Sequence, residues 1–258
     1  MASASEQAEF LRAEAGLRAL IERQLLATIT EIASTGADPR WVRDQVSAIT
    51  RSMVAEFGFA AAYLAEDWYN EIRAGERIPG EFLATASTRD FTKQVDETVR
   101  RAVGDLFGEA PDVNKFAVAV ASRAAQYAID GARNTIVENS IRDPHASGWA
   151  RVPHGKTCDF CLMLVGRGGV YKESTARFKA HPGCDCAAVP SWDLSAPEVP
   201  TIAYRASERL ESLRERAKSG DRSAQRRLSN HRARIRDYIA NNQDEFARLR
   251  RAYDLTPA

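Results

Sequence analysis

Five residues of the type that binds metal ions lie in two short clusters. They are Cys158, Cys161, His181, Cys184 and Cys186, and they include every cysteine of the 258-residue chain. A Cys-x-x-Cys turn brings two thiolates together, and zinc takes four Cys or His ligands in a closed tetrahedral site. The clustering therefore predicts one structural Zn²⁺ ion, held by four of these five candidates.

Two other interpretations of the cysteines remain open, namely a disulfide or redox pair and thiols packed without metal. Paired cysteines in a cytosolic protein more often bind metal, because thiols stay reduced there. Cys158 and Cys161 are the firmest pair of ligands. Cys184 and Cys186 would face the same side of an extended strand, whereas the three-residue step from His181 to Cys184 suits a turn. One of these last three is expected to lie beside the site without binding the metal.

The pattern does not favour an enzyme. Zinc deaminases carry His-x-Glu ahead of Pro-Cys-x-x-Cys, whereas here Cys-x-x-Cys comes first and no His-x-Glu occurs. A catalytic zinc also needs an open position, and five candidates favour a closed one. Gly166–Gly169 lacks the Gly-Lys-Ser/Thr ending of a phosphate-binding loop and is expected to form a turn. We expect His154 to be a loop residue.

Charge is distributed unevenly along the chain. Residues 1–145 carry a net charge of −6, residues 146–202 of +1 and residues 203–258 of +6. The densest basic group comprises Arg222, Arg226, Arg227, Arg232, Arg234 and Arg236. Four-residue spacing places some of these side by side on a helix. They predict either a solvated helix or a contact with DNA or an acidic protein surface, and any DNA contact would be independent of base sequence, since no base-reading motif is present.

The hydrophobic pattern predicts a mainly α fold that begins with a bundle of long helices. Apolar residues recur at three- and four-residue steps within residues 5–35, 39–75, 90–107 and 112–141. Trp41 and Trp68 lie on or beside the second stripe and are expected in the core. Short β-like runs occur at Trp149–Val152 and Ala187–Val189, and residues 203–252 favour helix, with an interruption at Gly220.

These differences in charge, hydrophobic period and cysteine content along the chain predict three domains. They are a helical bundle over residues 1–145, a small α+β Cys/His domain of zinc type over residues 146–200, and a basic helical tail over residues 201–258. Residues 1–9 contain no basic residue and no apolar core, so no secretory signal is expected. No apolar stretch approaches the ~20 residues that span a bilayer, so we expect no membrane contact and a protein that is soluble and cytoplasmic at synthesis.

The segment around the cysteines resembles the Mu F-like minor head proteins of tailed phages, particularly those of actinobacterial phages and prophages. The resemblance is carried by Ala150–Pro153, Thr157–Leu164, Gly169–Tyr171, His181–Cys186 and Val189–Pro190. It covers Cys-x-x-Cys and His-Pro-x-Cys-x-Cys in the same order, over less than a fifth of the chain. In one departure from the family pattern, Asp185 replaces the usual Arg between the last two cysteines.

The resemblance implies a minor component inside the virion head that acts in head assembly. Such proteins associate with the portal, scaffold or major capsid protein, and some stay with packaged DNA and affect its ejection. Cys158, Cys161, His181, Cys184 and Cys186 all match the family motif. No fused protease or ADP-ribosyltransferase motif is recognisable.

A second class of function stays open as the alternative, a metal-dependent nucleic-acid enzyme or binder such as an HNH-type nuclease. That activity needs a His base and a second His or Asn on a metal-binding helix. The chain has four His in all, and His231 lies in the Arg-rich segment without such a partner motif. We therefore favour the structural head protein.

Overall fold

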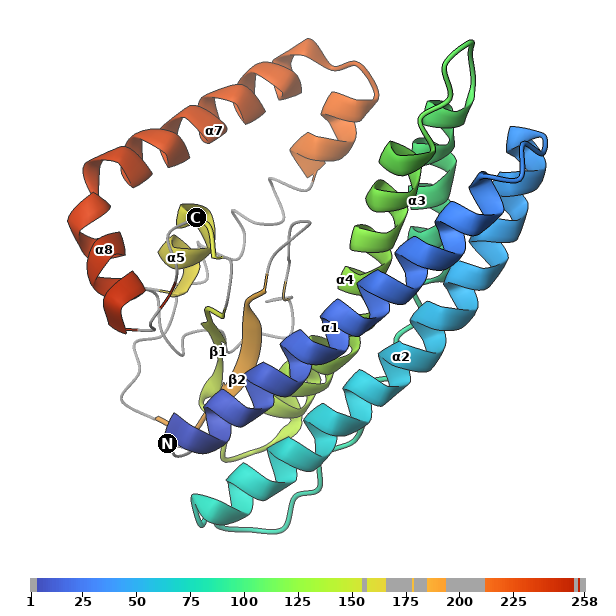
Figure 1. The fold of residues 1–258 in the computed structure, drawn as a ribbon. Coiled ribbons are helices and arrows are strands. Elements are labelled where there is room, and N and C mark those ends of the chain that lie inside the picture. Colours follow the sequence, from blue (N-terminus) through green and yellow to red (C-terminus); the bar gives the residue numbers. More distant parts are fainter. Residues whose placement is uncertain are drawn as a thin grey trace. The chain divides into compact units, whose positions relative to one another are not determined.

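The computed structural model describes residues 4–154, 157–165, 178, 185–193, 212–252 and 255. It is mainly helical (Figure 1), which confirms the predicted class. The chain divides into two compact units, one containing the described residues up to His145 together with Phe178, the other containing the described residues 146–165 and those from Asp185 onward. No helix in the described part of the chain is long and apolar enough to cross a membrane.

The first unit is built from four helices. They are α1 (Ala4–Ala33), α2 (Pro39–Gly75), α3 (Thr92–Ala102), which continues as a 3₁₀ turn η1 (Val103–Leu106), and α4 (Val113–Arg142). The predicted starts of α2 and α4 are confirmed. They could be predicted because a capping residue binds the backbone of its immediate neighbours. The Asp38 carboxylate accepts a hydrogen bond from the Arg40 amide at 2.8 Å, and Asp112 accepts one from the Lys115 amide at 2.9 Å. Each bond satisfies a backbone donor that has no partner within the helix.

Helix α4 is the central element of this unit. It packs against α1, α2 and α3, and its residues 124–129 and 131–137 are all buried. Its closest approach to α2 joins two glycines, because a Cβ atom at Gly131 would lie only 2.3 Å from the carbonyl oxygen of Gly58. Both helices carry alanines near this crossing, at Ala61, Ala62, Ala128 and Ala132. The crossing therefore depends on the absence of side-chain bulk.

A buried group of charges joins α1 to α4. The Arg133 side chain is 1% exposed, and its Nε lies 3.7 Å from a Glu14 oxygen. Its Nη1 donates a hydrogen bond to Asp130 Oδ1 at 3.0 Å, and its guanidinium lies over the Phe178 ring. Burial raises the pKa of Asp130, whereas Arg133 opposes that rise. Arg133 thus compensates carboxylates on both helices.

The two tryptophans expected in the core have different environments. Trp68 is 7% exposed and stacks on Phe10 of α1 with ring centroids 4.1 Å apart, so this prediction is confirmed. Trp41 is 48% exposed, so its assignment to the core was wrong. The buried stripe of α2 begins at Val42 and Val46. Trp41 lies one residue before that stripe, which rotates it by about 100° on a helix.

The second unit contains a short antiparallel ribbon and several helices. Strand β1 (Gly148–Val152) pairs with β2 (Ala187–Ser191), with Gly148 opposite Ser191 and Val152 opposite Ala187. Both strands confirm the predicted runs. The helices are α5 (Asp159–Val165), a turn of helix over residues 212–218, α7 (Arg222–Asn241) and α8 (Gln243–Ala252). Gly220, with φ of 92°, separates the helix over residues 212–218 from α7, as expected.

The glycine crossing yields a test of the bundle. Gly131→Ala adds a methyl group where the Gly58 carbonyl oxygen already lies, so α2 and α4 must separate. We expect the free energy of unfolding to fall by about 1–3 kcal/mol, the usual cost of overpacking a core, although alanine is the better helix former. Urea denaturation followed by circular dichroism measures the change.

Two other helical glycines serve as controls for this test. A Cβ atom at Gly58 would lie 3.8 Å from its nearest neighbour, and a Cβ atom at Gly16 has nothing within 4 Å. Gly58→Ala should therefore be tolerated, and Gly16→Ala should stabilise the unit by about 0.5–1 kcal/mol through helix propensity. Equal effects of the three substitutions would contradict a close contact at Gly131.

Candidate functional sites

The Cys-x-x-Cys pair lies at the start of a short helix in the second unit. Cys158 directly precedes α5, and Cys161 lies within its first turn. Cys161 is 1% exposed, whereas Cys158 is partly exposed. The Leu162 amide donates to the Cys158 carbonyl oxygen at 3.0 Å, which closes the turn. The local backbone thus holds two sulfur atoms on one turn of chain.

The ribbon brings Cys186 to the same region. Cys186 precedes Ala187, the partner of Val152, so it lies at the end of the ribbon from which the chain leads to Cys158. Its side chain is fully buried, and its Sγ lies 3.9 Å from Thr157 Oγ1. Thr157 also donates from its hydroxyl to the His154 carbonyl oxygen at 3.3 Å. A thiol far away in sequence therefore lies beside the residue before Cys158.

The other two candidate ligands, His181 and Cys184, lie outside the described residues, as does Gly166–Gly169. Within the described ranges, no three His, Cys, Asp or Glu side chains converge as a metal site would require. The described part of the region holds Cys158, Cys161 and Cys186. The zinc interpretation and the choice of ligands stay predictions.

The last helix of the chain contacts the cysteine turn directly. Arg250 of α8 donates to the Thr157 carbonyl oxygen at 3.2 Å and forms an ion pair with Asp159. Thr157 and Asp159 are the two neighbours of Cys158. Phe246 of α8 is 1% exposed, and α5 packs against both α7 and α8. One arginine therefore connects α8 to both neighbours of Cys158, through the backbone of Thr157 and the side chain of Asp159.

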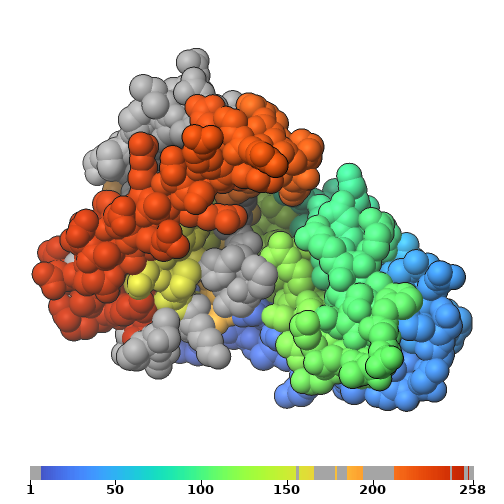
Figure 2. Space-filling view, turned by 90° about the horizontal axis from the view of Figure 1, so that it is seen from above, coloured from blue at the N-terminus to red at the C-terminus, as the bar shows by residue number. Residues whose placement is uncertain are grey.

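The six arginines singled out in the sequence all lie on α7 and all are exposed. Asp237 is the only acidic residue of this helix, and Ala224 is its only buried residue. At 100° per residue, Arg222, Arg226, Arg232 and Arg236 fall within one third of the helix surface. Figure 2 shows the side chains of this orange-to-red part of the chain at the molecular surface. Helix α7 therefore presents a row of cations to solvent.

The carboxylate of Asp221 fixes the beginning of α7. It accepts a hydrogen bond from the Ala224 amide at 3.0 Å and pairs with Arg216 at 2.6 Å. These contacts lower the pKa of Asp221, the amide bond being the larger cause. The ionised carboxylate also suits the positive end of the helix dipole. The cap holds the start of the arginine row in a defined helical conformation.

A polar cluster in the first unit was not predicted from the sequence. It holds an extended segment, residues 78–91, which we call the strap. On the α2 side, Arg73 donates to the carbonyl oxygens of Pro79 at 2.8 Å and Gly80 at 3.0 Å. Asn70 accepts from the Ala84 amide at 2.9 Å. Helix side chains thus satisfy strap backbone groups that strand neighbours would satisfy in a sheet.

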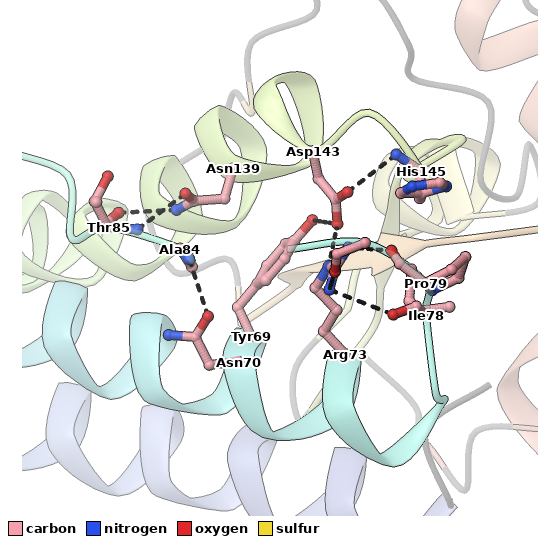
Figure 3. Close-up of polar contacts among 11 residues, drawn as sticks. Tyr69, Asn70, Arg73, Ile78, Pro79, Ala84, Thr85, Asn139, Asp143 and His145 are labelled. Atoms are coloured by element: carbon pink, nitrogen blue, oxygen red, sulfur yellow. Dashed lines mark hydrogen bonds and ion pairs between the residues drawn. The ribbon is translucent and has the colours of Figure 1, made fainter. Parts of the chain in front are cut away.

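Helix α4 holds the other side of the strap. Asn139 makes two hydrogen bonds to the backbone of Thr85, accepting at 3.0 Å and donating at 2.8 Å (Figure 3). Thr135 Oγ1 accepts from the Ser87 amide at 2.9 Å. Because the Asn139 amide binds the N–H and C=O groups of Thr85, this contact depends on the backbone conformation of the strap and not on the side chain at residue 85. The strap is therefore fixed in its position along α4.

A buried ion pair closes the end of the strap. Arg73 Nε donates to Asp143 Oδ2 at 2.9 Å, and both side chains are buried. The Tyr69 hydroxyl donates to the same oxygen at 3.2 Å, and the His145 amide donates to Oδ1 at 3.0 Å (Figure 3). Burial, followed by the nearby Asp143 charge, raises the pKa of Tyr69. The phenol therefore stays protonated and remains a donor to this carboxylate.

The signal for this cluster exists in the sequence. Glu66, Asn70 and Arg73 recur at steps of four and three, and Thr135, Asn139 and Asp143 recur at steps of four. Polar residues at helical spacing beside an apolar stripe usually face water. Here they bind the backbone of the strap, a role that could not be predicted without knowing that the strap passes between α2 and α4.

Comparison with known proteins gives one match. A family model described as VG15 protein matches residues 1–207. The chain belongs to the VG15 protein family. This family is a phage protein family, which confirms the viral class of the predicted function without showing a Mu F-like protein or a head role. No curated protein matches the chain significantly, and no solved structure does so.

The matched range includes all of the four-helix unit and all five candidate ligands. It ends before α7 and α8. The family assignment therefore applies to the strap and the cysteine turn. The arginine row must be interpreted from its own chemistry.

The strap cluster predicts a large effect from one substitution. Arg73→Met removes the partner of the buried Asp143 and the donors to Pro79 and Gly80. Breaking a buried ion pair from one side typically costs about 3–5 kcal/mol, because one charge stays buried without compensation. Urea denaturation should show a loss of this size.

Arg101→Met supplies the matched control. Arg101 is 79% exposed and pairs with Glu97 across one helical turn, so we expect a change below about 0.5 kcal/mol. Adding Asp143→Asn to the Arg73→Met variant should restore part of the lost stability, because it removes the uncompensated charge. A similar small loss in both single variants would show that the buried pair is not what fixes the strap.

Proposed function

We propose that this chain is a minor head protein of a phage, of the Mu F-like type, that enters the head during assembly. Membership of a phage protein family and the paired cysteine motif support this proposal. The role is structural rather than catalytic, with partners among the portal, scaffold and major capsid proteins. The protein then resides inside the virion head, after synthesis in the host cytoplasm.

The observation that carries the contact with packaged DNA is the arginine row of α7. Six exposed arginines share this helix with one acidic residue. The planar guanidinium group donates two parallel hydrogen bonds and therefore suits phosphate oxygens. A row of cations without a base-reading motif binds the backbone of any duplex, so the contact is independent of sequence. An acidic portal surface is the competing partner.

We also propose that the cysteine turn holds one structural Zn²⁺ ion. Cys161 and Cys186 are buried, and Cys186 lies beside the residue that precedes Cys158. A set of clustered thiol donors fits zinc, which prefers sulfur and nitrogen ligands. Cys158 and Cys161 would supply two sulfur ligands, and two of His181, Cys184 and Cys186 would complete the site. A bound ion would stabilise the turn that Arg250 also contacts.

The zinc proposal predicts about one Zn²⁺ per chain in protein purified without added metal. Cys158→Ser should lose most of the metal and lower the stability of the second unit, whereas circular dichroism should still show the helices of the first unit. Met163→Leu, a change of similar volume on α5, should keep the metal. Elemental analysis gives the result, and a metal-free wild-type protein with intact fold would rule the proposal out.

The DNA proposal is tested with two variants of equal charge change. One replaces Arg222, Arg226, Arg232 and Arg236 of α7 with Gln. The control replaces four exposed arginines of the first unit, Arg12, Arg40, Arg100 and Arg101. Binding to random duplex DNA is measured over a salt series. Each phosphate contact contributes about 0.9 to the slope of log affinity against log salt, so the α7 variant should bind about tenfold or more weakly, with a flatter slope.

Equal affinity of the two variants, or affinity indifferent to salt, would remove α7 from the DNA contact. Mass spectrometry of purified virions carrying each variant separates the other outcomes. An α7 variant that enters heads normally but binds DNA weakly supports the DNA contact. An α7 variant that is missing from heads, although its affinity for DNA is normal, supports the portal surface instead. Absence of the wild-type protein from virions would reject the head role itself.

A further inference from the structure

The ion pair between Arg250 and Asp159 joins α8 to the chain beside a candidate metal ligand. Asp159 is the first residue of α5 and directly follows Cys158. One guanidinium nitrogen of Arg250 pairs with its carboxylate, and a second donates to the Thr157 carbonyl oxygen at 3.2 Å. The Arg250 side chain is 21% exposed and that of Asp159 34%, so the pair is partly buried. A rigid fork with two donors thus contacts the residue on each side of Cys158.

The candidate ligands give a metal at this turn a negative charge. Two ligands come from the Cys-x-x-Cys pair and two from His181, Cys184 and Cys186, so every choice contains at least three cysteines. Metal binding requires thiolates and releases their protons. Three thiolates around one Zn²⁺ ion leave a net charge of −1, and four leave −2. Loading with Zn²⁺ therefore converts an uncharged group of ligands into an anionic one.

We propose that Arg250 is a positioning residue for the metal, an inference that rests on the zinc proposal above. The Asp159 carboxylate lies next in sequence to a thiolate ligand, so without a partner it would repel the anionic metal group. Arg250 offsets that carboxylate, and its bond to Thr157 fixes the backbone on the other side of Cys158. Charges interact more strongly at a partly buried site than in water. Arg250 therefore stabilises the metal-bound turn more than the metal-free turn.

The coupling acts in both directions, because a coupling free energy between two binding events is reciprocal. If α8 strengthens metal binding, the metal strengthens the contact of α8 with the cysteine turn by the same factor. Phe246 of α8 is 1% exposed and supplies the apolar part of this contact. Helix α8 directly follows α7, whose only buried residue is Ala224. The metal therefore fixes α8 and, through it, the end of the helix that carries the arginine row.

The first test measures the Zn²⁺ affinity of the full chain by competition with a chelator. Arg250→Met should weaken Zn²⁺ binding by about 10- to 100-fold, the usual effect of removing a group that supports a metal ligand. Arg251→Met is the matched control, because Arg251 is the next residue of α8 and is exposed. It removes the same charge and should leave the affinity unchanged. Equal affinities of the two variants would overturn the proposal.

A second substitution separates positioning from a general loss of folding. Asp159→Asn removes the charge and keeps the shape of the side chain, so adding it to Arg250→Met should restore part of the lost affinity. Thermal unfolding of the Arg250→Met chain should show a larger loss of stability with Zn²⁺ bound than without it. A loss of the same size in both forms, or a double variant that regains no affinity, would show that Arg250 only supports the fold and would overturn the proposal.

Elemental analysis of the same samples distinguishes this proposal from the zinc proposal. A wild-type chain without Zn²⁺ rejects both, whereas a Zn²⁺-bound chain whose affinity does not respond to Arg250→Met rejects the role of Arg250 alone. Hydrogen exchange gives the reciprocal measurement. Removing Zn²⁺ from the wild-type chain should speed the exchange of α8 amides. Exchange at the same rate with and without Zn²⁺ would overturn the coupling.

Discussion

The contact between Gly58 and Gly131 sets the distance between α2 and α4, and the other parts of the first unit follow from it. Two helices that cross at one point diverge on either side of it. Gly131 begins a series at four-residue steps, Gly131, Thr135, Asn139 and Asp143, along one face of α4. Beyond the glycines, Thr135 and Asn139 of that series bind the strap, and Asp143 binds Arg73 and Tyr69 of α2. The glycine crossing and the hydrogen-bonded strap are therefore one arrangement.

This arrangement explains why polar residues occur inside a helical bundle. A strap without secondary structure has backbone donors and acceptors that must be satisfied when buried. The side chains of Glu66, Asn70 and Asn139 satisfy them. Arg73 and Asp143 neutralise each other where burial is deepest. Apolar residues at these positions would leave the strap backbone without partners, so the polar stripes belong to the packing of the unit.

The sequence was sufficient for features that depend on neighbouring residues. Asp38, Pro39 and Asp112 determine helix starts locally, and short β-like runs mark both strands, so these predictions hold. It was insufficient where distant segments meet. Trp41 follows the apolar period closely enough to suggest the core, yet one residue of rotation leaves it exposed. The α4 partners of the strap and the Arg250 contact with the cysteine turn have no local signature, because the residues that they join are 48 to 93 positions apart.

The contact between Arg250 and Thr157 has a consequence for the order of events during synthesis. It joins residues that are 93 positions apart. Ribosomes add residues one at a time, and domains generally fold as they emerge, the N-terminal parts first. The four helices of the first unit can pack while residues after 145 are still being made, and Phe178 joins Arg133 later. The cysteine turn, in contrast, must wait without its α8 partner until residue 250 has left the ribosome. During that interval the turn lacks the hydrogen bond to the Thr157 carbonyl oxygen and the ion pair with Asp159, so this region reaches its final structure late in translation.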